Sequence, residues 1–566
     1  MKPFVSPLSL VPRITMALLA FPVLAGLAGT VIPGLGWMPA LGGTRFDLAP
    51  WAALVSTPGI WRSAGLSLAT GLGATAISLG AVILIVASWH GTRAFRLIRH
   101  TISPILSVPH AAAAFGLAFL IAPSGWIMRA LSPWVTGSDR PPDWLLPGDP
   151  WGLSLVAGLV AKEIPFLLLM TLAALPQADA DRSLRVAAML GYGRVSAWTK
   201  CVLPRIYGQI RLPVYAVLAY SLANVETAII LGPSTPPTLA VQLTTWMRDP
   251  DLAVWLMASA GATLQVLIVF LGLGIWTTGE RLARRVGYAW ILHGGRLPND
   301  AVLRAAGGLL ALFASVPVLL GIAGLATWSF AGFWAFPEIL PDRFTLQNWQ
   351  RAAPGLFSLS ATTLTIAFLS VALALVLVLG CLENGTRRRQ RAGRWALLLL
   401  YLPLIVPQIA FLFGLQILGL RIGLDGSLFA VVLAHLIFVL PYIYLSLADP
   451  WASLDPRLGV AAATLGASEN RIFWRLRLPM MLAPILTAAA VGFAVSIALY
   501  LPTLLIGAGR VPTLTTEAVA LAAGGDRRLI GVYGLLQAAL PFIGFALALL
   551  LPPLVWRNRR RMRIAA

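Results

Sequence analysis

The sequence has few charged residues and very little lysine or cysteine. Only 11% of its 566 residues are Asp, Glu, Lys or Arg, whereas 58% are hydrophobic, and the mean hydropathy is +0.83. This composition lies far outside that of soluble domains and predicts a membrane protein. The two cysteines, Cys201 and Cys381, are expected at or near a reducing cytoplasmic face and provide no disulfide framework.

Several catalytic and nucleotide-binding motifs are also absent. The only lysines are Lys2, Lys162 and Lys200, and none follows a glycine, so the chain has no Gly-Lys phosphate-binding loop. It also has no cluster of Cys and His with metal-ligand spacing, no His-Glu-x-x-His and no nucleophile elbow. We therefore expect a chain that is not an enzyme and that binds no metal or cofactor itself.

Long apolar blocks account for most of the chain. Twelve of them have about 20 residues or more, which is enough for each to cross a hydrocarbon core of about 30 Å. The expected fold is therefore an all-α polytopic membrane protein with about twelve transmembrane helices. The blocks lie near residues 13–34, 61–88, 102–123, 151–175, 211–232, 253–277, 303–332, 357–382, 395–419, 428–448, 480–506 and 530–556.

The distribution of charge predicts the orientation. If both termini and the loops after even-numbered blocks share one side, that side holds 29 of the 42 Lys and Arg residues but 8 of the 21 acidic ones. Positive residues favour the cytoplasmic face, so we place both termini there. The net charge of +21 could indicate nucleic acid, but the juxtamembrane position of the arginines favours lipid headgroups and no nucleic acid.

One loop pattern occurs twice. The first copy runs from Arg185 through Gly191 to Leu203-Pro204, and the second from Val460 through Gly466 to Leu478-Pro479. In both copies the glycine precedes the proline by thirteen positions. A short Ala-rich helix, a glycine turn, a second helical stretch and a Leu-Pro form a compact helix-turn-helix that is too short to span a bilayer. A single such loop would suggest only a surface loop, whereas two copies indicate a shared function.

The two copies belong to a longer repeat. Gly191 and Gly466, Gly232 and Gly507, and the Pro-Thr-Leu segments at 237 and 512 are all separated by 275 positions. This constant offset predicts two parallel halves of six helices each, related by an axis along the membrane normal. We predict a first half at 1–285 with its loop at 176–210, a cytoplasmic linker at 286–302, and a second half at 303–566 with its loop at 449–479.

A few ionisable residues lie inside the apolar blocks. Lys162 and Glu163 are adjacent in the fourth block, where they could either line a solute path or make structural contacts. Glu226 is isolated within the fifth block, and its partner in the repeat is Leu501. An isolated carboxylate there must be protonated, paired or beside a hydrated cavity, and it would suit a cationic solute. For His435 we expect satisfied packing rather than function.

The paired loops resemble the EAA loops of ATP-binding-cassette importer permeases, whose pattern is Glu-Ala-Ala, three residues, Gly, nine residues and Ile-x-Leu-Pro. The residues that match are Ala187, Gly191, Leu203 and Pro204 in the first copy and Ala461, Ala462, Gly466, Leu478 and Pro479 in the second. Cys201 and Leu476 occupy the Ile positions. Both copies lack the acidic residue, which is replaced by Arg185 and Val460, and this departure puts one ion pair with the partner in doubt.

The resemblance implies function and partners. It predicts a fused, two-half permease of a bacterial cytoplasmic membrane, with both loops docked on a homodimer of separate ATPase subunits that bind ATP and Mg²⁺. It also implies a periplasmic solute-binding protein. The chain is most similar to the fused permeases of ferric-iron, thiamine and polyamine importers, and to an uncharacterised branch associated with thiamine transport.

Two other functions remain open. A twelve-span secondary transporter driven by an ion gradient would need no ATPase, although the Gly-x-x-x-Asp-Arg loop usual after its second span is absent between Trp89 and Thr101. A membrane scaffold without transport is the third possibility. Co-purification of an ATPase would distinguish the first function from both others.

Overall fold

The computed structural model describes residues 7–39, 42–390 and 393–556, and within these residues the regular secondary structure is helical apart from two isolated β-bridges. Nine of the described helices are long and apolar enough to cross a membrane, and two bent helix pairs raise the number to eleven. The all-α polytopic fold is therefore confirmed. The block expected near 211–232 corresponds to α10 and α11, and these two helices are not among the eleven candidate spans. The prediction of twelve spans therefore stays a prediction.

The first half contains six principal helices and several short ones. The principal helices are α1 (Val11–Gly34), α3 (Ile60–Trp89), α5 (His110–Ile121), α7 (Leu153–Ala174), α10 (Leu203–Leu222) and α13 (Val254–Leu292). The short elements are η1 (Pro7–Ser9), α2 (Ala49–Ser56), α4 (Arg93–Ile102), η3 (Ser103–Ser107), α6 (Trp126–Leu131), η4 (Leu175–Ala178), α8 (Ala180–Met189), α9 (Arg194–Cys201), α11 (Glu226–Leu231) and α12 (Leu239–Trp246).

The second half follows the same order. Its principal helices are α14 (Ala301–Phe330), α15 (Gln347–Arg388), α17 (Gln408–Arg421), α18 (Leu428–Ala452), α22 (Leu482–Ala498) and α25 (Arg527–Val555). Its short elements are α16 (Arg394–Ile405), α19 (Pro456–Thr464), α20 (Glu469–Ile472), the π-helix η5 (Phe473–Arg477), α21 (Leu478–Met480), α23 (Leu501–Gly507) and α24 (Leu514–Ala522). The proposed domain boundaries and the cytoplasmic placement of the termini stay predictions, and residues 1–6 and 557–566 lie outside the described residues.

Proline breaks the third helix of each half. Pro109 immediately precedes α5 and Pro407 immediately precedes α17. The residue before each proline is extended, with ψ of 126° at Val108 and 129° at Val406, because a following proline ring disfavours the helical conformation. The helices α16 and α17 consequently meet at 89°.

The fifth helix of each half is broken too, and a glutamine from the sixth helix stabilises the break. Gln265 Nε2 donates a hydrogen bond to the carbonyl of Leu222, the last residue of α10, at 3.1 Å. In the second half Gln537 Nε2 donates to Thr515 Oγ1 at 2.8 Å, and Thr515 donates to the carbonyl of Ile497. Leu222 and Ile497 are 275 positions apart, so the two breaks are equivalent. Each frees a backbone carbonyl that must be satisfied in a membrane.

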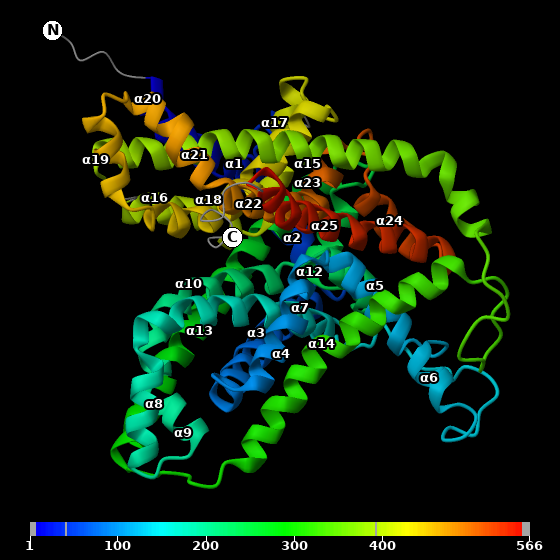
Figure 1. Ribbon diagram of the computed structural model, residues 1–566. Helices are drawn as coiled ribbons and strands as arrows, with labels where there is room; N and C mark the ends of the chain where they lie inside the picture. Colours follow the sequence, from blue (N-terminus) through cyan, green and yellow to red (C-terminus); the bar gives the residue numbers. More distant parts are fainter. Residues whose placement is uncertain (1–6, 40–41, 391–392, 557–566) are drawn as a thin grey trace.

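The first helix of each half packs against the other half. In Figure 1, α1 lies beside α17, and α14 passes beside α5 and α3; these pairs are among the most extensive helix contacts in the described structure. This exchange was not foreseen from the sequence. The two halves are therefore joined by helix packing as well as by the linker.

Glycines allow the exchanged helices to approach closely. A Cβ atom at Gly414 of α17 would overlap the carbonyl of Gly26 in α1, and one at Gly116 of α5 would lie 2.7 Å from the carbonyl carbon of Gly321 in α14. Thr30 also donates to the carbonyl of Ala410 across the first crossing at 2.5 Å. Small residues at helix crossings are the usual means of close packing in membranes, where dispersion and interhelical hydrogen bonds replace the hydrophobic effect.

At the end opposite the repeated loops, a buried arginine also joins the halves. Arg129 of α6 is 3% exposed and donates to the carbonyls of Ser124, Ala335 and Glu338 at 2.9, 2.6 and 2.7 Å. Its guanidinium also lies 4.5 Å from the centre of the Trp334 ring. The residues at 335 and 338 belong to the connection between α14 and α15, so the outer loop of the first half is fixed to the second.

We predict that Gly414→Val lowers the melting temperature of the purified chain in detergent, because the side chain would collide with the α1 backbone. Overpacking of this kind costs about 1–3 kcal/mol. Gly274→Val is the matched control, because no atom lies within 4 Å of the place that a Cβ atom would take at that helical glycine. Equal melting of the two variants by fluorimetry would contradict the proposed role of the crossing.

Candidate functional site

The first repeated loop folds as a helical turn stabilised by backbone hydrogen bonds. We call residues 180–204 the first knob; it contains α8, Gly191 and α9. Gly191 has a φ of +78°, which favours glycine, and its N–H bonds the carbonyl of Ala188 at 3.0 Å. The N–H of Tyr192 bonds the carbonyl of Ala187 at 3.1 Å. These two bonds make the Schellman end of helix α8.

The second knob, residues 456–480, repeats this turn. Gly466 has a φ of +80°, its N–H bonds the carbonyl of Ala463 at 2.9 Å, and the N–H of Ala467 bonds the carbonyl of Ala462 at 3.0 Å. After each turn the predicted Leu-Pro starts a new helix, α10 at Leu203-Pro204 and α21 at Leu478-Pro479. The turn that the glycine spacing predicts is present in both copies with the same bonding pattern.

Both knobs lie at the same end of the molecule. Figure 1 shows α8 and α9 at lower left and α19 and α20 at upper left, with α6 and the α14–α15 connection to the right. The turns present apolar side chains to the outside: Leu190 is 55% exposed and Leu465, its partner in the repeat, is 88% exposed. Leu190 and Leu465 thus occupy equivalent, exposed positions in the two copies.

The first knob is attached to the linker between the halves. The N–H of Gly193 and the hydroxyl of Ser196 both donate to the carbonyl of Arg296, at 3.0 and 2.6 Å. The N–H of Val195 donates to Asp300 Oδ2 at 2.8 Å. Because Asp300 immediately precedes α14, the first knob is fixed to the start of the second half.

A buried ion pair attaches the second knob. Glu383, near the end of α15, is 1% exposed and accepts from Arg477 Nη1 at 2.6 and 2.8 Å and from Arg387 Nε at 2.7 Å. Arg387 also bonds the side chain of Asn470 at 2.9 Å. No predicted site residue belongs to this anchor, and its one local signal in the sequence is an acidic residue just after the apolar block that ends at 382.

The basic residues of the first knob make internal contacts. Lys200 is 9% exposed and donates to the carbonyls of Trp290 and Gly295, and Arg194 donates to the carbonyl of His90. Burial lowers the pKa of the His90 imidazole, and Arg194 adds to this effect while Asp181 opposes it. Arg185, at the position of the missing acidic residue, instead lines a cavity of about 370 Å³ between α8, α9 and the turn at His90.

The structure places Lys162 in a structural position. Its ammonium donates to the carbonyls of Ile105 and Val108 at 2.8 and 2.6 Å, and the residue is 4% exposed. Those carbonyls lie at the break before α5, where the Ile105 carbonyl also accepts from the N–H of Val108 at 3.2 Å. The Lys162 ammonium thus caps the break. Of the two interpretations of Lys162, structural contacts are better supported than a place on the solute path.

Glu163 and Glu226, by contrast, lie in one polar cluster. Glu163 Oε1 is 3.8 Å from His110 Nε2, and the His110 ring lies 4.9 Å from the Tyr220 ring. The Tyr220 hydroxyl donates to Glu226 Oε1 at 2.9 Å. Two of the predicted pathway residues are therefore connected through a histidine and a tyrosine that sequence analysis had not selected.

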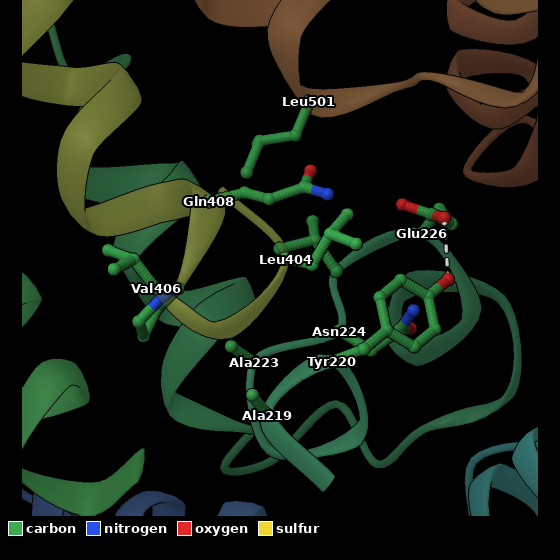
Figure 2. Close-up of a pocket in the computed structure, with 11 residues that line it drawn as sticks. Ala219, Tyr220, Ala223, Asn224, Glu226, Leu404, Val406, Gln408 and Leu501 are labelled. Carbon is green, nitrogen blue, oxygen red and sulfur yellow. Dashed lines mark hydrogen bonds between the residues drawn. The ribbon is translucent and has the colours of Figure 1, made fainter. Parts of the chain in front are cut away.

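A small cavity lies beside this cluster, between the helix breaks of the two halves (Figure 2). It is about 30 Å³, enough for one or two waters. We call it the seam cavity because Tyr220, Asn224 and Glu226 come from the first half and Leu404, Gln408 and Leu501 from the second. Leu501 is the repeat partner of Glu226, so the cavity lies where equivalent positions of the two halves meet.

His435 has the packing role that the sequence predicts. It is 2% exposed, and its two ring nitrogens lie 2.8 Å from the hydroxyls of Ser496 and Thr503. Those hydroxyls flank the break between α22 and α23. Both nitrogens are satisfied, so the histidine joins three helical segments of the second half.

The fold defines a helical, multi-pass membrane protein with two repeated loops, and comparison with known proteins identifies its family. The family described as the binding-protein-dependent transport system inner membrane component matches residues 377–555. The inner membrane ABC transporter permease protein YnjC of Escherichia coli is 34% identical over 522 residues, covering 91% of this chain and 93% of YnjC. The chain therefore belongs to the binding-protein-dependent ABC transporter permeases and is a multi-pass inner membrane permease component.

Shorter matches carry names with different cargoes. The molybdenum transport system permease protein ModB of Mycobacterium tuberculosis is 30% identical over 226 residues, covering 38% of this chain and 78% of ModB. The spermidine/putrescine transport system permease protein PotC of Haemophilus influenzae is 29% identical over 136 residues, covering 24% of this chain and 52% of PotC. One name refers to a metal and the other to polyamines, so similarity alone does not identify the cargo.

We predict that Glu383→Gln loosens the second knob, because Arg477 and Arg387 would lose their shared carboxylate. Breaking a buried pair by removing one partner costs about 3–5 kcal/mol at most sites, and somewhat less where a neutral acceptor remains. Amide hydrogen exchange over 469–480 should accelerate at least about tenfold. Glu469→Gln is the control, because its half-exposed carboxylate lies 3.5 Å from Arg477 and contributes little. Unchanged exchange in Glu383→Gln would show that the ion pair does not anchor the knob.

Proposed function

We propose that this permease forms the solute pathway of an ATP-driven importer and receives mechanical work from ATPase subunits through its two knobs. The observation that carries the proposal is the pair of identically bonded turns, 275 positions apart, at one end of the molecule and with apolar tips exposed. Equivalent surfaces at two places suit a partner that is itself a symmetric dimer.

The anchors supply a route for the work. Asp300 joins the first knob to the start of α14, and Glu383 joins the second knob to the end of α15. Both helices pack along the junction between the halves, α14 against α5 and α15 against α1. Closure of the ATPase subunits would draw the knobs together and change the packing beside the seam cavity, and hydrolysis would reverse this movement.

The partners follow from the same proposal. A homodimer of ATPase subunits would carry ATP and Mg²⁺, which this chain would not bind, and a solute-binding protein would deliver cargo at the opposite end. Basic residues along the exposed cytoplasmic side would contact lipid headgroups. Because Arg185 and Val460 replace the acidic residue of the EAA pattern, docking would rely on the shape of the turn and on apolar contacts at Leu190 and Leu465.

The alternative, a secondary transporter, predicts different biochemistry. We expect an ATPase subunit encoded beside this chain to co-purify with it from detergent-solubilised membranes. A chain that transports its solute with no ATPase bound, and that responds to an ion gradient alone, would favour the alternative. A scaffold would neither co-purify with an ATPase nor transport a solute.

We predict that Gly191→Val or Gly466→Val abolishes ATP-driven uptake and ATPase co-purification while membrane insertion continues. A β-branched residue at a φ near +80° is strained, so the turn would distort. At Gly466 no neighbouring atom lies within 4 Å of the place that a Cβ atom would take, which limits the effect to the backbone.

Gly466→Asn is the matched control for this prediction, because asparagine tolerates the left-handed conformation. It should retain much of the co-purification. Normal uptake by both valine variants would refute the role proposed for the knobs.

A further inference from the structure

The seam cavity has the Glu226 carboxyl group in its lining and the Glu163 carboxyl group in the adjoining polar cluster. Glu163 and Glu226 are 4% and 9% exposed, and among the described residues neither forms a salt bridge with a Lys or Arg. An isolated ionised carboxylate is costly to bury, so such groups are normally paired, protonated or solvated. In a chain with a net charge of +21, two unpaired carboxylates near one cavity are unusual.

The nearest lysine does not neutralise the cluster. Lys162 precedes Glu163 in the chain, but its ammonium is held by the carbonyls of Ile105 and Val108. Consecutive helical residues point in different directions, so this arrangement directs the positive group away from the carboxylate. His110 is the one basic side chain that the described structure places within contact distance of Glu163, and it is a neutral imidazole unless protonated.

Asn224, which lines the same cavity, has an unused hydrogen-bond donor. Its Oδ1 accepts from the N–H groups of Thr227 and Ala228 at 2.9 and 3.2 Å, which fixes the orientation of the amide. Its Nδ2 is buried and has no hydrogen-bond partner among the described residues, although Asn224 lines the cavity and is only 5% exposed. A buried donor without a partner costs about 1–3 kcal/mol, so the site favours a bound molecule that supplies an acceptor.

The second half contributes only neutral groups to the cavity. Figure 2 shows the Gln408 amide extending toward Glu226, with Leu404 and Leu501 nearby. Gln408 directly follows Val406-Pro407 as His110 follows Val108-Pro109, so these two residues are equivalent, and Leu501 lies 275 positions after Glu226. All the acidic groups of this site therefore come from one half, and an aromatic ring, that of Tyr220, lies beside the carboxylates.

We propose that the seam cavity is a transit site for an organic cation that also carries a hydrogen-bond acceptor. Glu226 and Glu163 attract the positive group, the Tyr220 ring packs against it, and Asn224 Nδ2 donates to the acceptor. The inference rests on the proposed transport function, since it assigns a cargo class to that pathway. An anion would meet the two carboxylates and be repelled.

Entry requires the halves to separate locally. The cavity of about 30 Å³ is too small for an organic solute, but its walls are the helix breaks at Ala223–Val225 and at Val406-Pro407. Broken helices re-orient more easily than continuous ones, so movement of the halves would enlarge this space first.

The test is equilibrium binding to the full-length chain in lipid nanodiscs, which does not depend on an ATPase. The probes are the organic cations choline, acetylcholine and ethanolamine, each of which carries an oxygen acceptor, the neutral choline isostere 3,3-dimethylbutan-1-ol, and the anion molybdate. We expect at least one cation to bind more tightly than the neutral isostere and molybdate. Glu226→Gln should weaken that binding at least about tenfold, and Asn224→Leu should weaken it without removing the preference for a cation.

The control for Glu226→Gln is Glu517→Gln, which removes a carboxylate of α24 that does not line the cavity. The Glu517→Gln variant should bind the cation as tightly as the unaltered chain does. The proposal is wrong if no cation binds better than the neutral isostere, or if Glu226→Gln binds the preferred cation unchanged. Failure of ATPase co-purification would instead refute the proposed function, so the two failures can be distinguished.

Discussion

The close approach of glycines between the halves is the constraint on which the rest of the structure depends. Gly26 meets Gly414, and Gly116 meets Gly321, at distances that leave no room for a side chain. In a membrane, where lipid tails are as apolar as the protein surface, such backbone contact is a principal source of helix association. It holds the first helix of each half inside the other half. The seam cavity can then be bordered by both halves at once.

Different contacts attach the loops at the two ends of the molecule. At one end, the two knobs have the same Schellman turn but different anchors: backbone and hydroxyl bonds to the linker in the first knob, and the Glu383 ion pair in the second. At the other end, Arg129 fixes an outer loop of the first half to the second half. Both knobs are attached to helices of the second half, the first to α14 and the second to α15.

The sequence was most informative where a backbone conformation depends on one residue. Glycine predicted the turns at Gly191 and Gly466, because this residue frees the local dihedral angles itself. The helix exchange and the anchors could not be predicted in this way. They depend on contacts between residues hundreds of positions apart, such as Thr30 with Ala410, for which no local pattern exists. Lys162 and Glu163 show the same limit. The sequence placed both residues in one helix, but only the fold shows that Lys162 bonds backbone carbonyls whereas Glu163 belongs to the polar cluster.

Fusion of the two halves explains why such a polar site can be one-sided. In a dimer of identical halves, each substitution near the axis appears twice, so a carboxylate at position 226 would face a second one where Leu501 now lies. Two buried like charges at short range repel strongly and would force one to remain protonated. A single fused chain removes this restriction, because the repeat can keep its glycines and prolines while its side chains diverge. Glu226 with Leu501 and His110 with Gln408 are two such divergences beside one cavity, and together they give the site a negative side and a neutral side.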